Sequence, residues 1–508
     1  MRRRGGAPLA VRVGHLDPLP WVAGAVALAV FVLHRWDGFL TRDLALYSYA
    51  GQQVANGVPP YDGVLNRAGP LAHLLPAVGV LAARAAGVDE LLGMRVFYML
   101  LTVVAIAVAY LLGRDFFVSR AAGLVTAATL LSFHAVVLYA TGGPREKTPM
   151  LLLILGALWA AKDRRWFTAG VLVSLATLTL QIAFFFAFPA VLFLLLALVP
   201  RGARLAATVR VAVGGLVPVL VCIGYFLAVG ALGSFFNGFL LLNASYQEAD
   251  TLLSGPGQAW ESMKHGYGRS LWFLLTGLAL TAGFAVAAAR REHRQRSPWL
   301  GPVAALALAV VVDLLWNLRD FDSWADAIPV LPVAALGFGA AAKALQERLP
   351  SRVALGASAA WLAVALVSVF VYTVTERPDV LVEQRRSVQA VLGTLGPEAT
   401  VLSVEAPQAL VLTGRSNPTR FQMFTGGMWR YVDDTWPGGI EGFRESMLEE
   451  ERPAVVAINP DRLDSWQEGL DRSYVRIGRA PGWRWYARRT LGPDVIVDLK
   501  EAAAAAES

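Results

Sequence analysis

Long apolar runs alternate with short polar segments over the first 375 residues. A helix needs roughly 20 apolar residues to cross a bilayer core of about 30 Å, and most of these runs approach that length. Apolar residues follow one another without strict alternation, which favours helices over the strands of a barrel. We predict about 11 spanning helices, at residues 19–34, 95–113, 121–140, 149–161, 167–180, 182–200, 211–230, 271–289, 299–316, 327–342 and 353–372.

Residues 167–200 form one uninterrupted apolar stretch. A single helix of this length would reach about 51 Å, which is too long for one crossing. We therefore expect a break at Gln181 and two passes.

Segment 70–86 is apolar enough to cross, but the basic residues argue against it. If it does not cross and the N-terminus is cytoplasmic, most basic residues fall in short cytoplasmic loops, beginning with Arg2, Arg3, Arg4 and Arg12. A crossing at 70–86 would reverse this bias for every later loop. We predict an amphipathic helix on the outer surface, a cytoplasmic N-terminus and a C-terminus outside the cell membrane.

The pattern changes after residue 375. Charged residues become frequent, and short β-type runs occur at 400–404 and 454–458, followed by a hairpin pattern over 474–487. Helical stretches are predicted near 380–394, 438–450 and 463–470. Residues 1–375 thus form a mainly α, polytopic membrane domain, and 376–508 form a small α/β domain. The alanine run 502–506 is expected to be frayed.

Composition excludes a soluble protein. The 508 residues are 56% hydrophobic and 16% charged, and the net charge of +7 reflects arginines in short loops rather than a nucleic-acid surface. Cys222 is the single cysteine, so no internal disulfide can form. The N-terminus begins like a signal peptide, but the first apolar run ends in His34-Arg35-Trp36-Asp37 without a small-residue cleavage site, and we expect a retained helix.

Polar and glycine-rich segments gather on the outer side of the predicted topology. They are the first loop 35–94, the turn 141–148, the loop 231–270, the turn 317–322 and the residues after about 373. An outward-facing site follows from this asymmetry.

Two of these segments resemble a known family. The stretch from Arg42-Asp43-Leu44 through Pro59-Pro60-Tyr61-Asp62 to Gly69-Pro70-Leu71 resembles the first external loop of polyprenyl-phosphate-sugar-dependent glycosyltransferases of the C-type fold. Protein mannosyltransferases and aminoarabinose transferases belong to this group. Gly143-Pro144-Arg145-Glu146-Lys147-Thr148-Pro149 is similar to a lesser degree. The resemblance implies an inverting transfer of mannose or a similar sugar from a polyprenyl phosphate to a glycan, lipid or protein acceptor outside the membrane.

The resemblance implies that the carboxylate of Asp43 is catalytic and acts as the general base. Asp37 and Asp62 are alternatives for which a structural role is favoured, at the membrane interface and in a turn. Candidate cations for the donor phosphate are Arg145, Lys147, Arg95 and Arg67, and candidate substrate contacts are Tyr47, Tyr61, His73 and Arg319.

No nucleotide loop or zinc-ligand spacing occurs, so no cofactor is predicted with certainty. Asp320 and Asp322 have the chemistry to bind a divalent metal, with surface pairing to Arg319 as the favoured alternative. The aromatic residues of 420–439 suit either a sugar-stacking surface or a small aromatic core.

Two other functions remain open: a transporter or flippase of lipid-linked glycans, and a non-catalytic membrane assembly protein. A transporter would place ionisable residues at mid-membrane, where Asp313 is the strongest candidate. The other acids crowd the outer loops, which favours the enzyme.

The predicted topology can be tested with reporter fusions after Ala161 and after Glu376. We expect a cytoplasmic signal from the first and an external signal from the second, because the basic loops hold the short connections inside. A cytoplasmic signal after Glu376 would contradict both the topology and the outward-facing site.

Overall fold

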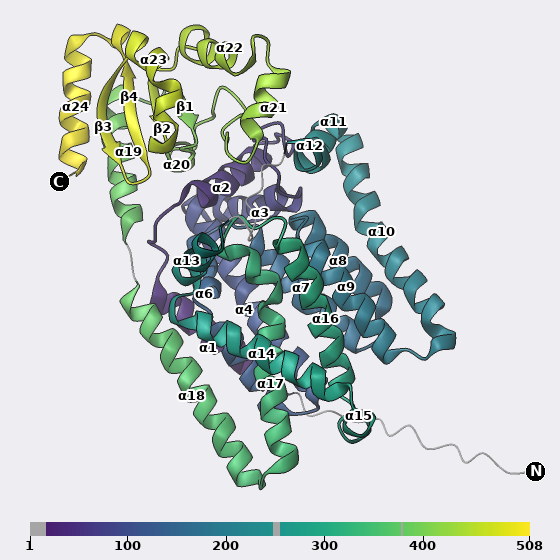
Figure 1. Cartoon of the computed structure of the whole chain (residues 1–508). Helices are drawn as coiled ribbons and strands as arrows, with labels where there is room; N and C mark the ends of the chain where they lie inside the picture. Colours follow the sequence, from purple (N-terminus) through teal and green to yellow (C-terminus); the bar gives the residue numbers. More distant parts are fainter. Residues whose placement is uncertain (1–16, 247–254, 377–378, 508) are drawn as a thin grey trace, which may run out of the picture.

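The computed structural model describes residues 17–246, 255–376 and 379–507. Helices dominate it, and a small four-stranded sheet with its own helices covers one end (Figure 1). The predicted class, a polytopic helical membrane protein with a small C-terminal α/β unit, is confirmed. The predicted Arg2, Arg3, Arg4 and Arg12 lie outside the described residues.

The helical part runs from residue 19 to residue 375. Its α-helices are α1 (Leu19–His34), α2 (Arg42–Ala55), α3 (Leu71–Ala86), α4 (Glu90–Phe117), α5 (Arg120–Leu131), α6 (His134–Gly142), α7 (Lys147–Lys162), α8 (Trp166–Thr179), α9 (Ala183–Leu198), α10 (Arg204–Ala228), α11 (Leu232–Phe235), α12 (Leu242–Ser245), α13 (Pro256–Tyr267), α14 (Leu271–Ala288), α15 (Arg291–Arg296), α16 (Leu300–Asn317), α17 (Leu331–Arg348) and α18 (Ser351–Thr375). Four short helical segments of other types are η1 (Arg201–Ala203), η2 (Phe236–Leu241), η3 (Gly268–Ser270) and η4 (Trp324–Val330).

Six helical segments of the described residues are long and apolar enough to cross a membrane, and the bent pair α5–α6 makes a seventh. The six contain α4, α10, α14, α16, α17 and α18, while α1, α3, α8 and α9 are shorter apolar helices. Each predicted span falls on one of these helices or on α7. Large apolar side chains along α10 face outward, as Leu205 and Val221 do with 76% and 67% exposure, which suits contact with lipid.

The span predicted at 121–140 corresponds to a bent pair of helices, because α5 and α6 meet at 65°. The hydrogen bonds at the break explain the bend. Ser132 Oγ donates to the Thr129 carbonyl (2.8 Å), and the His134 amide donates to Ser270 Oγ (3.1 Å), so backbone and side chains are satisfied without a regular turn.

The predicted break near Gln181 is confirmed, because α8 ends at Thr179 and α9 begins at Ala183. The Gln181 amide donates to the carbonyls of Arg67 (2.9 Å) and Phe239 (3.1 Å). The break therefore ties the loop that carries Arg67 to η2 at the level of the helix ends.

Segment 70–86 is helical, as predicted, and α3 packs against α2 and α4. Its sidedness relative to the membrane stays a prediction. The short basic helix α15 and the turn between α17 and α18 lie at the end of the molecule opposite the sheet (Figure 1).

The C-terminal unit is built on strands β1 (Val401–Val404), β2 (Val455–Ile458), β3 (Tyr474–Ala480) and β4 (Trp483–Arg488), in the order β1-β2-β4-β3. β1 and β2 are parallel, while β4 is antiparallel to both β2 and β3. The predicted strands and hairpin are confirmed. The helical elements of this unit are α19 (Val380–Leu395), α20 (Gln408–Val411), α21 (Met428–Thr435), α22 (Gly439–Glu445), η5 (Ser446–Glu450), η6 (Pro460–Arg462), α23 (Leu463–Ser473), η7 (Arg489–Leu491) and α24 (Pro493–Glu507).

The alanine run 502–506 belongs to α24, so the prediction of a frayed tail is wrong. α24 packs on α19 and β3, and buries Leu499 and Ala503 almost completely. Small side chains let the helix approach the strand closely: a Cβ added to Gly478 would come within 2.6 Å of Ala503 Cβ. The run reflects close packing rather than disorder.

The C-terminal unit and the segment around α2 share one hydrophobic core, which includes Leu40, Leu44 and Tyr49 together with Leu410 and Val411. Backbone contacts reinforce it, since the Leu65 amide donates to the Arg420 carbonyl (3.0 Å). This shared core holds the C-terminal unit over the start of α2.

Replacement of Leu499 by Ala tests the docking of α24. Because Leu499 is fully buried, we expect a loss of roughly 2–5 kcal/mol in the stability of the C-terminal unit. Thermal unfolding of the full-length protein in detergent measures it. Val497→Ala on the same helix is the control, because Val497 is 51% exposed and should change stability by about 0.5 kcal/mol or less. Equal melting temperatures for both variants would contradict the packing.

Candidate active site

A cavity of about 700 Å³ lies where the helical part meets the C-terminal unit. Its wall combines charged groups, amides and apolar side chains from both parts of the chain. The charged groups are Arg42, Asp43, Arg67, Arg145, Glu146, Lys147, Asp320, Asp322 and Asp326.

Asp43 lies in the first turn of α2, which sequence analysis places in a loop. Thr41 caps this helix by accepting a hydrogen bond from the Leu44 amide (3.4 Å). A carboxylate in the first turn of a helix interacts favourably with the unpaired amides there. The first turn of α2 therefore directs the Asp43 carboxylate into the cavity.

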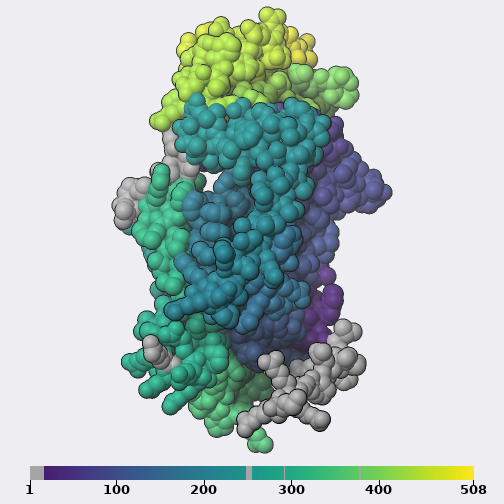
Figure 2. All heavy atoms as spheres, turned by 90° about the vertical axis from the view of Figure 1, so that its right-hand side faces the viewer, coloured from purple at the N-terminus to yellow at the C-terminus, as the bar shows by residue number. Residues whose placement is uncertain are grey.

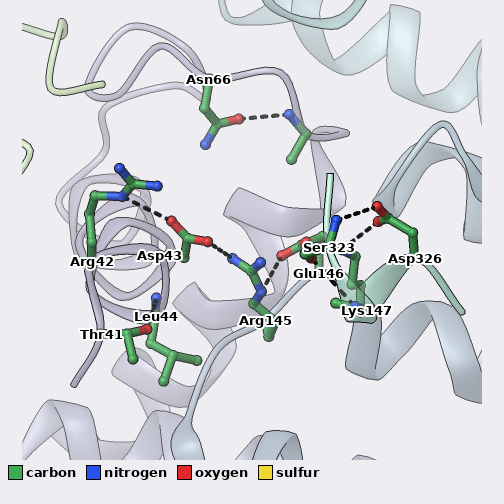
Figure 3. Close-up of polar contacts among 12 residues, drawn as sticks. Thr41, Arg42, Asp43, Leu44, Asn66, Arg145, Glu146, Lys147, Ser323 and Asp326 are labelled. Atoms are coloured by element: carbon green, nitrogen blue, oxygen red, sulfur yellow. Dashed lines mark hydrogen bonds and ion pairs between the residues drawn. The ribbon is translucent and has the colours of Figure 1, made fainter. Parts of the chain in front are cut away.

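Two arginines hold Asp43. Arg42 Nε lies 3.2 Å from Oδ1 and Arg145 Nη1 lies 2.8 Å from Oδ2 (Figure 3). Burial by itself raises the pKa of Asp43, but the charges of Arg145 and Arg42 outweigh it and lower the pKa to about 2. The carboxylate is ionised at neutral pH and keeps 35% of its side chain exposed to the cavity.

Arg145 is aimed at Asp43 by a glycine turn. α6 ends at Gly142, and Gly143 has φ +120°, a conformation that side chains rarely adopt. The Arg145 guanidinium lies 5.7 Å from the ring centres of both Tyr47 and Tyr139, and its Nε is 3.4 Å from Glu146. It is thus clamped between two aromatic rings and two carboxylates.

Lys147 follows at the start of α7 and is more tightly engaged. Its Nζ lies 3.0 Å from Asp326, and 4.0 Å from Glu146 (Figure 3). Asp326 also accepts from the amides of Asp322 and Ser323 at the start of η4. The pair anchors the 320–326 segment to α7.

Arg67 is the most loosely paired cation of the cavity wall. Its Nη2 is 3.8 Å from Asp322, and its buried Nη1 has no hydrogen-bond partner. Burial and the neighbouring Asp326 raise the pKa of Asp322 to about 6, against the lowering effect of Arg67. Gly426 of the C-terminal unit lies on the guanidinium: a Cβ there would come within 2.7 Å of Nη2. Arg67 therefore has capacity for another anion.

One wall of the cavity is apolar. It consists of Leu180, Ile182, Phe185, Phe239, Leu240 and Trp316. Phe185 and Trp316 stack with ring centres 3.6 Å apart. Figure 2 shows this side of the molecule hollowed beneath the teal segments that include α11 and α12. Charged and apolar surfaces therefore meet in one space.

Several cavity residues escaped sequence analysis. Arg42, Asn66, Asn243 and Asn317 line the wall, as do Met423, Thr425, Gly426 and Met428 of the C-terminal unit. Arg42 adjoins the predicted acid in sequence, which was the one available signal. Segment 423–428 lies within the aromatic stretch 420–439, but that pattern did not show that the segment lines this cavity, because its position depends on the packing of the C-terminal unit.

Four predicted site residues lie outside the cavity wall. Arg95 is buried and donates to the carbonyls of Trp36 and Gly38, which holds the chain after α1. Tyr61 donates to the Ala68 carbonyl (2.8 Å), and buried His73 contacts Asn66 (3.1 Å). These two contacts hold Asn66 and Ala68, the residues on either side of Arg67.

Arg319, the fourth, is exposed and stacks on Trp316 at 5.9 Å. The alternative acids also lie elsewhere: Asp37 pairs with Arg35 (2.7 Å), and Asp62 lines a separate cavity. That cavity also contains Phe421 and Trp436, which pack with Phe443 as an aromatic cluster.

Within the described residues, no group of three or more His, Cys, Asp or Glu side chains could hold a metal ion. Two acids of the cavity pair with cations instead: Asp43 with Arg145 and Asp326 with Lys147.

Comparison with known proteins shows the fold. No protein-family model and no curated protein matches the chain. Among solved structures, ArnT from Cupriavidus metallidurans bound to undecaprenyl phosphate is similar, with a TM-score of 0.63 and 15% identity over 94% of this chain and 100% of that chain.

Two further structures are similar at 15% identity. The oligosaccharyltransferase of Archaeoglobus fulgidus in complex with Zn and sulfate has a TM-score of 0.51 over 95% of this chain and 76% of that chain. The mycobacterial arabinofuranosyltransferase AftD has a TM-score of 0.52 over 94% of this chain and 40% of that chain. The chain thus has the C-type glycosyltransferase fold, as a multi-pass membrane protein.

Proposed function

We propose that the protein is a membrane glycosyltransferase that moves a sugar from a polyprenyl phosphate to an acceptor outside the cytoplasmic membrane. The composition of one cavity carries the proposal: a carboxylate, a set of arginines and an apolar wall face the same space. A lipid-linked donor needs all three, namely a base for the acceptor, cations for the phosphate and an apolar path for the lipid.

Charge and polarity support one arrangement of the donor. Its polyprenyl chain would lie on the wall around Phe185 and Trp316, and its phosphate would reach Arg67 and Arg145. Arg67 supports this placement most directly, because its buried Nη1 lacks a partner. Lys147 contributes positive charge while it stays paired with Asp326.

The acceptor would enter from the side of the C-terminal unit, where Thr425 and Met428 line the cavity. Its hydroxyl oxygen attacks the anomeric carbon of the donor, the bond from that carbon to the phosphate oxygen breaks, and polyprenyl phosphate leaves. The hydroxyl proton passes to Asp43. Attack opposite the leaving group inverts the anomeric carbon.

Asp43 is a weak base while two arginines hold it. A donor phosphate on Arg145 would add negative charge beside the carboxylate and share its cation, which raises the proton affinity of Asp43. The base would thus become competent when the donor is in place.

ArnT, with the same fold, has been seen bound to undecaprenyl phosphate, and AftD is an arabinofuranosyltransferase. The first supports a donor with a lipid phosphate, and the second supports the transfer of a sugar. Mannose or a similar hexose or pentose is the proposed sugar, and a glycan, lipid or protein the proposed acceptor.

A transporter of lipid-linked glycans is the alternative. Its mid-membrane candidate, Asp313, is buried in α16 and accepts a hydrogen bond from Asn317 (3.0 Å) rather than facing a pathway for a glycan. Incubation of the purified protein with a panel of polyprenyl-phosphate sugars and acceptors, followed by mass spectrometry, separates the two. Sugar transfer supports the enzyme; movement of intact donor across vesicles without transfer supports the transporter.

Asp43→Asn is expected to lower turnover by about 10²–10⁴-fold, because the amide keeps the shape but cannot accept the proton. Donor affinity should stay close to that of the parent. Asp322→Asn is the matched control, since Asp322 is a second carboxylate of the cavity wall. A larger loss of turnover in Asp322→Asn than in Asp43→Asn would make Asp322 the base.

Arg67→Gln and Arg145→Ala are expected to weaken donor binding, each through a lost charge-assisted contact of roughly 1.5–3 kcal/mol. Titration with a polyprenyl phosphate in detergent measures the change. Arg319→Gln is the control, because Arg319 is exposed and outside the cavity wall. Equal affinity in all three variants would contradict the placement of the phosphate.

A further inference from the structure

Glu405 is a fully buried acid of the C-terminal unit, immediately after β1. It is not among the residues that line the cavity, and none of the transfer steps described so far uses it. Its backbone has φ +50°, a left-handed conformation that a side chain of this size rarely adopts. A buried, ionised carboxylate persists only when charges and hydrogen bonds satisfy it.

Four groups satisfy Glu405. Its Oε1 accepts from the backbone amides of Phe424 (2.7 Å) and Thr425 (3.1 Å). Its Oε2 pairs with Arg42 Nη1 (2.9 Å) and Arg462 Nε (3.2 Å). One carboxylate of the C-terminal unit therefore holds both a loop of the cavity wall and an arginine of α2.

Arg42 is shared between two acids. Its Nη1 lies against Glu405, and its Nε lies 3.2 Å from Asp43. Asp43 and Glu405 thus compete for one guanidinium. Within the part of the chain that the structure describes, Arg42 forms ion pairs with both Asp43 and Glu405.

We infer that Glu405 is a positioning residue of the transfer reaction, acting on Asp43 through Arg42. This inference rests on the proposed function. The charge of Glu405 offsets that of Arg42, so Asp43 keeps more of its ability to accept a proton. Without that charge, Arg42 is left to Asp43 alone and holds it as a weaker base. The C-terminal unit thereby completes the catalytic centre that α2 begins.

The other charged groups around Asp43 are not altered by a substitution at Glu405. Arg145 pairs with its second oxygen, and Glu146 lies behind Arg145. Across the cavity stand Arg67, Lys147, Asp320, Asp322 and Asp326. Arg462 balances Glu405 from the side of η6.

Glu405→Gln isolates the charge, because the amide oxygen can still accept from Phe424 and Thr425. We expect kcat to fall by about tenfold, with the KM values for donor and acceptor within about twofold of the parent. Glu405→Ala removes the loop contacts as well and should also raise the acceptor KM. Glu449→Gln is the control, because the Glu449 carboxylate accepts a hydrogen bond from Ser473 of the same unit and is not among the residues that line the cavity.

The decisive measurement repeats Glu405→Gln in an Arg42→Gln background. If Glu405 acts through Arg42, the second substitution adds no further loss of kcat. The same tenfold loss in both backgrounds would overturn the inference and leave Glu405 a structural residue.

Arg42→Lys keeps the test informative if Glu405→Gln does not fold. Lysine retains the charge but lacks the fork that spans both carboxylates, so kcat should fall with unchanged KM values. Parent kcat in Arg42→Lys would overturn the inference. A parent protein without transferase activity would instead refute the proposed function, which distinguishes the two failures.

Discussion

The ion pair between Asp43 and Arg145 is the contact on which the rest of the site depends. It joins the start of α2 to the turn before α7, two segments separated by about a hundred residues of chain. Buried charges are stable only when every member of their network is paired. The network continues in both directions, through Arg42 to Glu405 and through Glu146 and Lys147 to Asp326. The helical part and the C-terminal unit are therefore linked by alternating charge as well as by their shared core.

This alternation explains how a strongly charged cavity can lie beside an apolar wall. Each acid lowers the free-energy cost of burying the cation beside it. Phe185 and Trp316 stack at the edge of the same cavity. Arg67 departs from the rule, because its contact to Asp322 is long and its Nη1 has no partner. A phosphate bound in the cavity would accept a hydrogen bond from Arg67 Nη1. In the proposed reaction the acceptor would enter on the side formed by segment 423–428, so that both substrates would meet at Asp43.

Sequence patterns predicted which segments form the cavity better than they predicted which side chains face it. Asp43, Arg145, Lys147, Arg67 and Tyr47 all line one cavity, as the predicted outward-facing site requires. Arg95, Tyr61 and His73 lie close to these residues in the sequence, yet their side chains are buried and hold neighbouring backbone or side chains instead of lining the cavity. Periodicity and charge bias identify the end of a helix where a residue lies. They do not specify which way a loop side chain points, because that depends on its packing partners.

The sequence by itself determined the helical membrane class, the break near Gln181, the strands of the C-terminal sheet and the polar end of the bundle. These features follow from local hydrophobicity and from interactions between near neighbours in the chain. Only the tertiary structure decided that Glu405 reaches Arg42, that segment 423–428 closes the cavity and that the alanine run of α24 packs against β3. Glu405 and Arg42 are 363 positions apart. Contacts over such distances arise from how whole elements pack, and no local pattern encodes them.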